Sequence, residues 1–398
     1  MLATTIADNI YAISVNDRTT DLFEDLWPIA KEGVTYNSYL INDQKKVLID
    51  LTKDFKTDTL VNQVAAVLNP ADLDFIVINH MEPDHTGAIK TVLRMAPKAV
   101  IMCTAKATPM LEAYYEITER IHEVEDGETL DVGSRTLKFV HTPFVHWPET
   151  MMTYSIEDEI LFSCDAFGGY GALQGFTFDD ECGDLEFYKK ESLRYYSNIV
   201  AKFSQPVLNA IHKLEGIPVK VIAPSHGLIW RSHPEHIIEL YEKWAHYAKG
   251  GTETAVTLLY GSMYGNTEGI MNSVAKSIAD AGVPVEVMDV ARTHSSYVLP
   301  SLWTKKGVII GAPTYEGSLF PAMQSTLQEA AIKRVMYKKT AIFGSYGWSG
   351  GAEKKIRTIV EPLKWEVESV FRFRGGPTDE DLRQALEFGT RFAKSLTA

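Results

Sequence analysis

The chain has few cysteines and no long apolar run, and each absence excludes a class of protein. Its 398 residues include three scattered cysteines, Cys103, Cys164 and Cys182, and no C-x-x-C pair. A disulfide framework and a thiolate zinc site are therefore not expected, and a reducing cytoplasm is favoured. No apolar run approaches the ~18 residues that a membrane span needs. The first residues show no basic segment before an apolar core, so no secretory signal is expected.

An excess of positive charge is also missing. The formal net charge is −13, which predicts that nucleic acid is not a partner. The acidity is uneven, because residues 1–253 hold 22 basic and 38 acidic side chains, whereas residues 254–398 hold 17 and 14. The two parts therefore carry net charges of −16 and +3. Since a length of this size predicts two or three domains at ~150 residues each, the change in charge marks a candidate boundary.

The C-terminal part has the pattern of a doubly wound α/β domain. Apolar runs that predict buried strands alternate there with helical stretches, after a short Gly-containing linker at residues 249–252. This alternation predicts a parallel sheet covered on both faces, in a domain of residues 254–398. The expected strands are residues 255–260, 307–311 and 340–343, and the expected helices include 268–281 and 378–395.

The N-terminal part, residues 1–250, has a different pattern. Closely spaced strands joined by turns alternate with separate helical stretches, which predicts a mixed sheet sandwiched by helices. The expected strands are residues 36–41, 47–51, 75–79, 136–140, 151–156 and 160–163. The expected helices are residues 57–68, 87–95, 185–203 and 234–248.

Four side chains that can bind metal follow the strand at residues 75–79. They are His80, Glu82, Asp84 and His85. In an extended segment His80 and Glu82 point to the same side, whereas Asp84 and His85 open the next helix. A single one of them would usually be a solvated loop residue, but grouped charges at the end of a buried strand need a partner or a metal ion.

Three more candidate ligands stand at or soon after strand ends. They are His146, Asp165 and His226. Each taken alone has an ordinary alternative role as a cap or turn residue, but loops at one edge of a sheet are where such sites are assembled. The other histidines lack such neighbours and are interpreted as structural or surface residues: His122, His141, His212, His233, His236, His246 and His294.

The ligand types favour a redox metal. Four imidazoles and three carboxylates without a thiolate suit iron or manganese, and a carboxylate placed to bridge makes a two-metal centre plausible. Glu82 adds an anionic ligand that stabilises a ferric ion. Zinc-dependent hydrolysis is the alternative, because zinc accepts the same ligand types.

Three loops at strand ends of the C-terminal part predict a phosphate and flavin site. Residues 261–268 join a strand to a helix with small and hydroxyl side chains, which suits a phosphate but also an ordinary capped turn. Residues 311–317 and 344–351 combine glycines with Tyr315 and Trp348, which could stack on a planar ring. Loops at one edge of a parallel sheet resemble the FMN site of flavodoxin. The candidate FMN-binding residues are Ser262, Met263, Tyr264, Gly265, Asn266, Thr267, Pro313, Thr314, Tyr315, Gly317, Ser345, Tyr346, Gly347, Trp348 and Gly350.

The combination resembles the flavodiiron proteins, or A-type flavoproteins, which are reductases of O2 or NO. The H-x-E-x-D-H run resembles the metallo-β-lactamase motif H-x-H-x-D-H with its second His replaced by Glu82. The resemblance covers essentially the whole chain and implies a metallo-β-lactamase-like αβ/βα sandwich followed by a flavodoxin-like doubly wound parallel sheet. It implies FMN and two iron ions per chain as cofactors. The implied catalytic ligands are His80, Glu82 and His146 on one iron, Asp84, His85 and His226 on the other, and Asp165 between them.

The resemblance implies an oxidoreductase that passes electrons from FMN to a non-haem diiron centre. The centre would reduce O2 to water, NO to N2O, or both, and so protect against oxidative or nitrosative stress. The alternatives are a zinc hydrolase with a flavodoxin-like docking module and a pure electron carrier with a vestigial first domain. Many relatives carry a His where this chain has Glu24, so the preference between O2 and NO stays open, and in some relatives the residue matching His85 does not bind iron.

The resemblance also implies partners. No rubredoxin-like C-x-x-C domain follows the flavodoxin-like half in this sequence, so a separate protein such as rubredoxin, or a reduced deazaflavin, is expected to deliver electrons. A head-to-tail homodimer, or a dimer of such dimers, is expected to place the flavin domain of one subunit against the metal domain of the other. The charges of −16 and +3 favour that contact weakly, because salt screens surface fields within about 8 Å.

Overall fold

The computed structural model describes residues 3–397 and divides into two units, one ending at Glu242 and the other beginning at Lys243. The division falls inside one helix rather than in the linker expected at residues 249–252. No helix of residues 3–397 is both long and apolar enough to cross a membrane.

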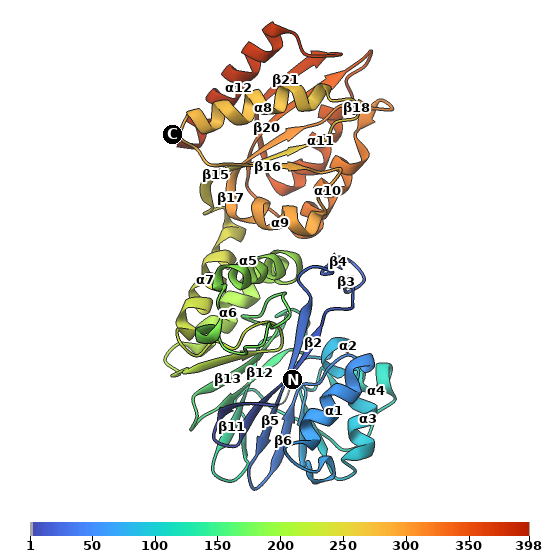
Figure 1. Ribbon diagram of the computed structural model, residues 1–398, viewed down its shortest axis with the longest axis vertical. Coiled ribbons are helices and arrows are strands. Elements are labelled where there is room, and N and C mark those ends of the chain that lie inside the picture. The colour runs from blue at the N-terminus through green and yellow to red at the C-terminus, as the bar shows by residue number, and fades with distance from the viewer. Residues whose placement is uncertain (1–2, 398) are drawn as a thin grey trace. The chain divides into compact units, whose positions relative to one another are not determined.

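The first unit contains two mixed sheets that pack face to face (Figure 1). The strands of the first sheet, in spatial order, are β1 (Thr4–Ala7), β2 (Ile10–Asp17), β5 (Val34–Asn42), β6 (Lys46–Ile49), β7 (Phe75–Val77), β8 (Val100–Cys103) and β9 (Ile121–Glu123). Those of the second are β10 (Thr129–Asp131), β11 (Thr136–His141), β12 (Met151–Ser155), β13 (Ile160–Cys164) and β14 (Val221–Pro224). The strands β3 (Leu22–Phe23) and β4 (Trp27–Pro28) form a separate hairpin.

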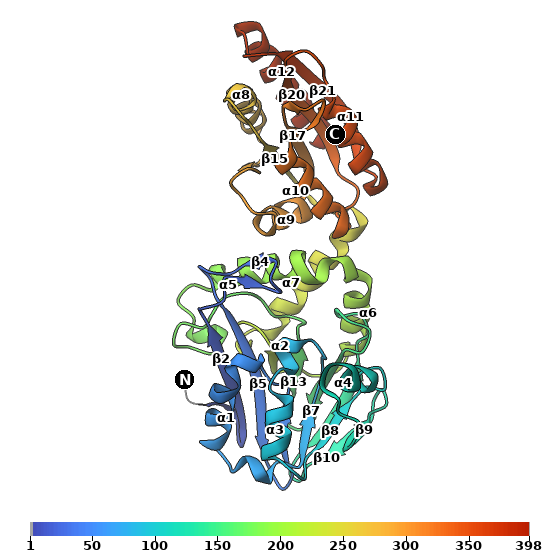
Figure 2. The same ribbon diagram turned by 90° about the vertical axis from the view of Figure 1, so that its right-hand side faces the viewer.

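Alternating apolar side chains of the two sheets form the core between them. Tyr39 and Ile49 come from the first sheet, and Phe139 and Phe162 come from the second, all of them buried. Helices lie on the outer sides of this sandwich, with α1, α3 and α4 beside the first sheet (Figure 2). The helices are α1 (Thr57–Ala65), α2 (Pro83–Thr86), α3 (Ile89–Met95), α4 (Thr108–Tyr115), α5 (Leu185–Tyr195), α6 (Ser204–Leu214) and α7 (Pro234–His246).

Two expectations for this unit need correction. The residue pattern predicted one mixed sheet, whereas the predicted hairpins belong to two sheets whose apolar faces cover each other. The helix expected over residues 185–203 is α-helical only to Tyr195, continues as a π-helix over Tyr196–Val200, and passes through a 3-10 turn into α6. π-Helical turns recur beside functional sites. The residue pattern did not predict this change of helix type, because apolar residues occur on both sides of the π-helical turn.

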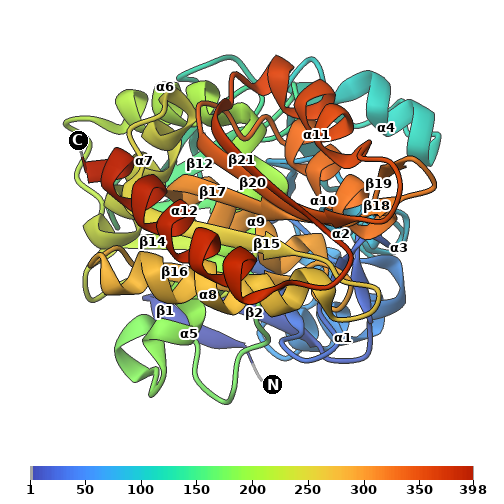
Figure 3. The same ribbon diagram turned by 90° about the horizontal axis from the view of Figure 1, so that it is seen from above.

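The second unit is a parallel five-stranded sheet covered on both faces. Its spatial order is β16 (Val285–Asp289), β15 (Glu253–Tyr260), β17 (Lys305–Gly311), β20 (Lys339–Tyr346) and β21 (Glu366–Arg374), with every neighbouring pair parallel. Figure 3 shows α8 (Asn266–Asp280) and α12 (Asp379–Thr397) side by side on one face. The remaining helices are α9 (Ser295–Thr304), α10 (Pro321–Ile332) and α11 (Ala352–Val360), and a small hairpin pairs β18 (Thr314–Tyr315) with β19 (Ser318–Leu319).

The three strands that the sequence predicted for the second unit correspond to the three central strands of its sheet, β15, β17 and β20. The edge strands β16 and β21 were not predicted, because both alternate charged with apolar residues and lie half exposed. The fully apolar runs in β15, β17 and β20 are buried on both faces, as a parallel sheet between helices requires.

Candidate metal centre and flavin pocket

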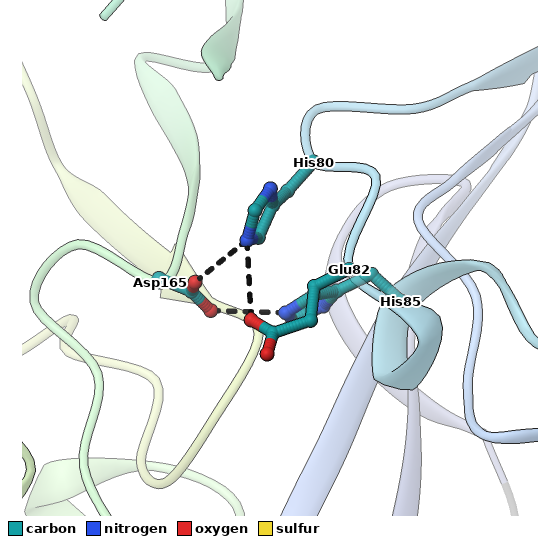
Figure 4. Close-up of side chains that lie close together, drawn as sticks. All are labelled: His80, Glu82, His85 and Asp165. Atoms are coloured by element: carbon teal, nitrogen blue, oxygen red, sulfur yellow. Dashed lines mark hydrogen bonds and ion pairs between the residues drawn. The ribbon is translucent and has the colours of Figure 1, made fainter. Parts of the chain in front are cut away.

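The seven predicted ligands meet at the edge of the sandwich where strands of both sheets end. His80 and Glu82 lie in the loop after β7, and Asp84 and His85 lie on the short helix α2. His146 lies between β11 and β12, Asp165 directly follows β13, and His226 follows β14. In Figure 4, Asp165 approaches His80 and His85 from the opposite side of the site. Every one of the seven side chains is buried.

One group of ligands surrounds one oxygen of Asp165. Oδ2 of Asp165 lies 3.4 Å from Nε2 of His80 and 3.2 Å from Nε2 of His146. Oε2 of Glu82 lies 3.3 Å from the same atom of His80 and 3.1 Å from that of His146. Two imidazoles and two carboxylates therefore converge on one point, which defines metal position one.

A second group surrounds the other oxygen of the same carboxylate. Oδ1 of Asp165 lies 3.0 Å from Nε2 of His85 and 3.3 Å from Nε2 of His226. The oxygens of Asp84 lie 3.3 Å from each of these two nitrogens. The three side chains Asp84, His85 and His226, with Asp165, define metal position two. Asp165 thus lies between two candidate metal positions, and His85 lies at the second while its ligand atom is also within 4.8 Å of those of His80 and Glu82.

The opposite charges in the two groups stabilise one another. Burial alone would raise the pKa of Asp165 and of Glu82, but the neighbouring histidines hold both well below their ordinary values. Burial opposes a charge on the imidazoles, yet the carboxylates raise the pKa of His146 to about 9 and that of His226 to about 10. Because the carboxylates raise the pKa of these imidazoles, metal ions compete with protons for them.

The atoms that converge on the two positions fit metal ions. Within residues 3–397, both oxygens of Asp84 and of Asp165, both ring nitrogens of His85, and Nε2 of His226 are buried without a hydrogen-bond partner. Buried polar atoms without partners are rare, and converging acceptors and imidazole nitrogens are the arrangement that a shared cation satisfies. The donor set of oxygen and imidazole nitrogen suits iron or manganese.

Two of the histidines are oriented by partners of Nδ1, the ring nitrogen that faces away from the metal positions. The sequence did not reveal these partners. Oε1 of Glu149 lies 2.7 Å from Nδ1 of His80 and also accepts the backbone N–H of Met81 at 2.9 Å. The carbonyl oxygen of Thr35 lies 2.7 Å from Nδ1 of His226. Such outer partners fix the tautomer that leaves Nε2 free for metal. The only sequence signal for Glu149 is its place three residues after His146.

Asp50 holds the start of the first ligand loop. Its two carboxylate oxygens accept the backbone N–H of Asn79 at 2.8 Å and the side-chain amide of Asn79 at 3.0 Å. The other amide atom of Asn79 accepts a hydrogen bond from Thr153 on β12 at 2.8 Å. The residue before His80 is therefore tied to both sheets, which positions the loop rigidly.

The hairpin of β3 and β4 brings Glu24 to metal position one. Ligand atoms of Glu24, Glu82 and His146 lie within 4.8 Å of one another, and Trp27 donates to Oε2 of Glu24 at 3.0 Å. Partial desolvation of the carboxyl group and the charge of Glu82 raise the pKa of Glu24, although much of this side chain is exposed. Phe23, on the same hairpin, packs edge-on against His226. Glu24, which stands where many relatives carry a His, therefore lies beside the candidate ligands.

A pocket of about 320 Å³ opens at the carboxyl edge of the second unit. Eleven of the predicted flavin residues line it: Met263, Tyr264, Asn266, Pro313, Thr314, Tyr315, Gly317, Ser345, Tyr346, Gly347 and Trp348. Tyr264 and Trp348 are 88% and 91% exposed, so both rings are available to a bound partner. Gly351 lets the loops meet, because a Cβ there would lie 1.8 Å from the carbonyl oxygen of Gly317.

The other predicted flavin residues lie around this pocket. Ser262 and Gly265 hold the first loop, since the Ser262 hydroxyl accepts the N–H of Gly265 at 3.0 Å. Thr267 is buried at the start of α8, with its hydroxyl 3.2 Å from that of Ser345. Gly350 lines a small neighbouring cavity. Glu316 and Ser349, which lie within the predicted loops but were not named as candidates, also line the pocket. Gly375 on the pocket wall was not predicted, because strand β21 before it was not predicted.

Comparisons with known proteins identify the families of the two units. Residues 34–227 match the ODP family of beta-lactamases, and residues 258–389 match the flavodoxin family. An anaerobic nitric oxide reductase flavorubredoxin of Pectobacterium carotovorum is 34% identical over 399 residues, covering 99% of this chain and 78% of that relative. The chain belongs to the flavodiiron protein family.

Solved structures extend the match of this flavodiiron protein to the whole fold. Rubredoxin oxygen:oxidoreductase from Desulfovibrio gigas is 28% identical with a TM-score of 0.94, over 99% of this chain and 98% of that one. A flavodiiron protein from Giardia intestinalis is 26% identical with the same TM-score, over 100% and 97%. The predicted order of a metallo-β-lactamase-like domain followed by a flavodoxin-like domain is confirmed.

Proposed function

We propose that this flavodiiron protein passes electrons from FMN to a pair of irons that reduces O2 to water, NO to N2O, or both. The observation that carries the proposal is Asp165, whose two carboxylate oxygens face two separate groups of ligands. Relatives named for nitric oxide reduction and for rubredoxin:oxygen oxidoreduction support the same class of reaction. A zinc hydrolase is not favoured, because hydrolysis gives no role to the flavin pocket.

The residues of the first unit would hold two irons per chain. His80, Glu82 and His146 would bind the first, Asp84, His85 and His226 the second, and Asp165 both. When bound, the irons and FMN supply the gas binding and electron storage that side chains lack. The chain's own contribution is to exclude water by burying every ligand, and to fix the imidazoles through Glu149 and the Thr35 carbonyl.

The residues of the second unit would hold FMN. The N-terminal end of α8 presents backbone N–H groups and the Asn266 and Thr267 side chains, which suit the phosphate. The exposed rings of Tyr315 and Trp348 on the pocket wall suit the isoalloxazine ring.

The flavin and the irons would meet between two chains in a head-to-tail dimer. Exposed apolar side chains surround each site: Leu22, Leu26, Phe55 and Phe144 in the first unit, and Met263, Tyr264, Tyr315 and Trp348 in the second. Exposed apolar patches at a functional site mark interaction surfaces. The opposite net charges of the two parts favour pairing unlike surfaces over like ones. Two such dimers could associate further.

Electrons would reach FMN from outside. The rim of the flavin pocket is open and aromatic, which suits docking of a small redox protein such as rubredoxin or access by a reduced deazaflavin. Iron-based reduction of O2 and NO would give the cell protection against oxidative and nitrosative stress.

Metal analysis combined with a visible spectrum tests the proposal. Anaerobically purified protein reconstituted with iron and FMN should hold two irons and one flavin per chain, with the yellow absorption of bound FMN. Retention of zinc in preference to iron, with hydrolytic activity, would support the hydrolase instead. Flavin without metal would leave only an electron carrier.

A further inference from the structure

The two metal positions have the same inner ligands. Each is faced by two imidazoles, one carboxylate of its own and one oxygen of Asp165. Bound irons would therefore have nearly equal inner charge. Any difference between them must come from groups outside these ligands.

The outer partners of the histidines differ strongly. Nδ1 of His80 faces the carboxylate of Glu149 at 2.7 Å, whereas Nδ1 of His226 faces a neutral carbonyl, that of Thr35, at the same distance. Nδ1 of His85 is buried with no hydrogen-bond partner among the described residues. An anion hydrogen-bonded to the far nitrogen of a ligand thus occurs at position one and at neither of these two histidines of position two. The buried carboxylate of Asp50 acts electrostatically on His85, but its oxygens accept hydrogen bonds from Asn79 and not from the His85 ring.

Contacts on several sides hold Glu149 in a fixed position behind His80. It is 2% exposed, and its Oε1 accepts a hydrogen bond from the backbone N–H of Met81. Its own carbonyl accepts the hydroxyl of Thr104 at 2.8 Å, which holds the backbone in place. In residues 3–397 His80 is the only cationic group in an ion pair with Glu149, and Oε2 has no hydrogen-bond partner. Its negative charge is therefore directed at His80.

An anion hydrogen-bonded to the far nitrogen of an imidazole makes that imidazole a stronger donor to a metal. The negative charge also stabilises a trivalent ion over a divalent one, and weak screening in a buried site preserves this effect. Glu24 lies near Glu82 and His146, so this further carboxyl group close to the ligands is also on the side of position one.

We propose that Glu149 makes the two irons unequal, so that the iron held by His80, Glu82 and His146 is the first to be oxidised and carries the ferric charge in the half-oxidised pair. The inference rests on the proposed diiron function. Glu149 touches neither metal position and acts through His80, so it is a positioning residue. When O2, NO or a chemical titrant accepts one electron from the diferrous pair, that electron would come from position one, and the second electron accepted would come from position two.

The test compares the wild-type holoprotein with Glu149→Gln, which keeps the shape and an acceptor oxygen but removes the charge. Both are reconstituted with 57Fe and FMN and titrated anaerobically, with the half-oxidised pair followed by EPR and Mössbauer spectroscopy. Glu157→Gln is the matched control, because that carboxylate also accepts a backbone N–H, from Thr136, but at the far end of the second sheet.

We expect Glu149→Gln to raise the potential of the first oxidation more than that of the second, so that the maximum fraction of half-oxidised pairs falls. The ferric Mössbauer signal of the remaining half-oxidised pairs should change, and Glu157→Gln should match the wild type. Equal shifts of both oxidations, a larger shift of the second, or no shift would overturn the proposal. A wild-type protein that binds no iron pair would instead contradict the proposed function.

Loss of an outer partner typically weakens metal binding about 10–100-fold, so the Gln variant is reconstituted at saturating iron. If it still fails to load both positions, Glu149→Asp replaces it, because the shorter side chain keeps the charge at a longer distance. The first oxidation should then rise by a smaller amount and the second should not. An unchanged first oxidation in that variant would also overturn the proposal.

Discussion

Asp165 meets His85 at 3.0 Å through the carboxylate oxygen that faces away from His80. This contact places His85 beside the second group of candidate ligands, where the family resemblance had also placed it. Because the other oxygen of Asp165 faces His80 and His146, one carboxylate connects the two groups. Its removal is therefore the most direct change to the proposed centre.

Replacing Asp165 by Ala should abolish gas reduction and leave FMN bound. The change removes a ligand from both positions and leaves two cations without a shared anion, so turnover should fall by more than the roughly 10–100-fold typical of an outer partner. Iron content, flavin content and turnover are measured together. Asp126→Asn, at an exposed ion pair with Lys213, serves as the control. Near-normal turnover by Asp165→Ala would refute the bridging role.

Replacing Asn266 by Ala and Thr267 by Val should release FMN and leave the irons in place. Each lost hydrogen bond to a charged phosphate costs about 1.5–3 kcal/mol, so binding should weaken at least about 100-fold. Fluorescence titration of the flavin-free protein with FMN measures the change. Thr390→Ala, on the exposed side of α12, is a matched control. Unchanged affinity for FMN would show that the first loop is only a turn.

Electron transfer between chains can be tested with the two defective variants. Asp165→Ala lacks a working metal pair, and the Asn266/Thr267 variant lacks flavin, so each should be inactive alone. After subunit exchange, a mixed head-to-tail dimer pairs one intact flavin with one intact metal pair and should recover activity. Mass spectrometry of differently tagged chains proves exchange. Proven exchange without any activity would exclude transfer between chains.

Lys338 should give the second unit a pH-dependent stability. The side chain is 2% exposed and donates to the carbonyl oxygens of Trp303 and Lys305, and burial lowers its pKa from the usual 10.5 to about 7. Between pH 7 and 10.5 the unfolded chain holds a proton that the folded chain lacks, so the free energy of unfolding rises with pH in this range. The slope is at most about 1.4 kcal/mol per pH unit.

Lys338→Met should lose that slope, which urea unfolding at pH 7 and pH 9.5 measures by circular dichroism and flavin fluorescence. Lys339→Met is the control, because Lys339 is the next residue in the chain and its ammonium group is partly exposed and pairs with Glu368. If the wild type and Lys338→Met change in parallel with pH, Lys338 does not titrate in this range.

The inner ligands could be predicted from the sequence because each stands directly at a strand end or soon after it. The carboxyl ends of β7, β13 and β14 meet at one edge of the sandwich, which brings together residues far apart in the chain. Their residue types are rare in buried positions without a metal or a partner. Pattern and chemistry therefore indicated the same set of side chains.

The outer partners could not be predicted in this way. The partner of His226 is a backbone carbonyl, which no residue type encodes, and Glu149 looks like an ordinary turn residue after Pro148. Likewise, the edge strands β16 and β21 carry alternating charges that conceal them, and Gly375 on the flavin pocket wall was missed with β21. Three-dimensional contacts, rather than local pattern, determine these roles.

Reoxidation of the fully reduced holoprotein by O2 and by NO, followed by stopped-flow absorbance, measures whether electrons pass from FMN through the irons to the gas. The matched control is the same protein loaded with zinc in place of iron, with FMN retained. The iron-loaded protein should oxidise its flavin rapidly, forming water without peroxide from O2 and N2O from NO. The zinc-loaded protein should react slowly with O2 and release peroxide. Equal rates and products with iron and with zinc would contradict electron transfer from FMN through a diiron centre.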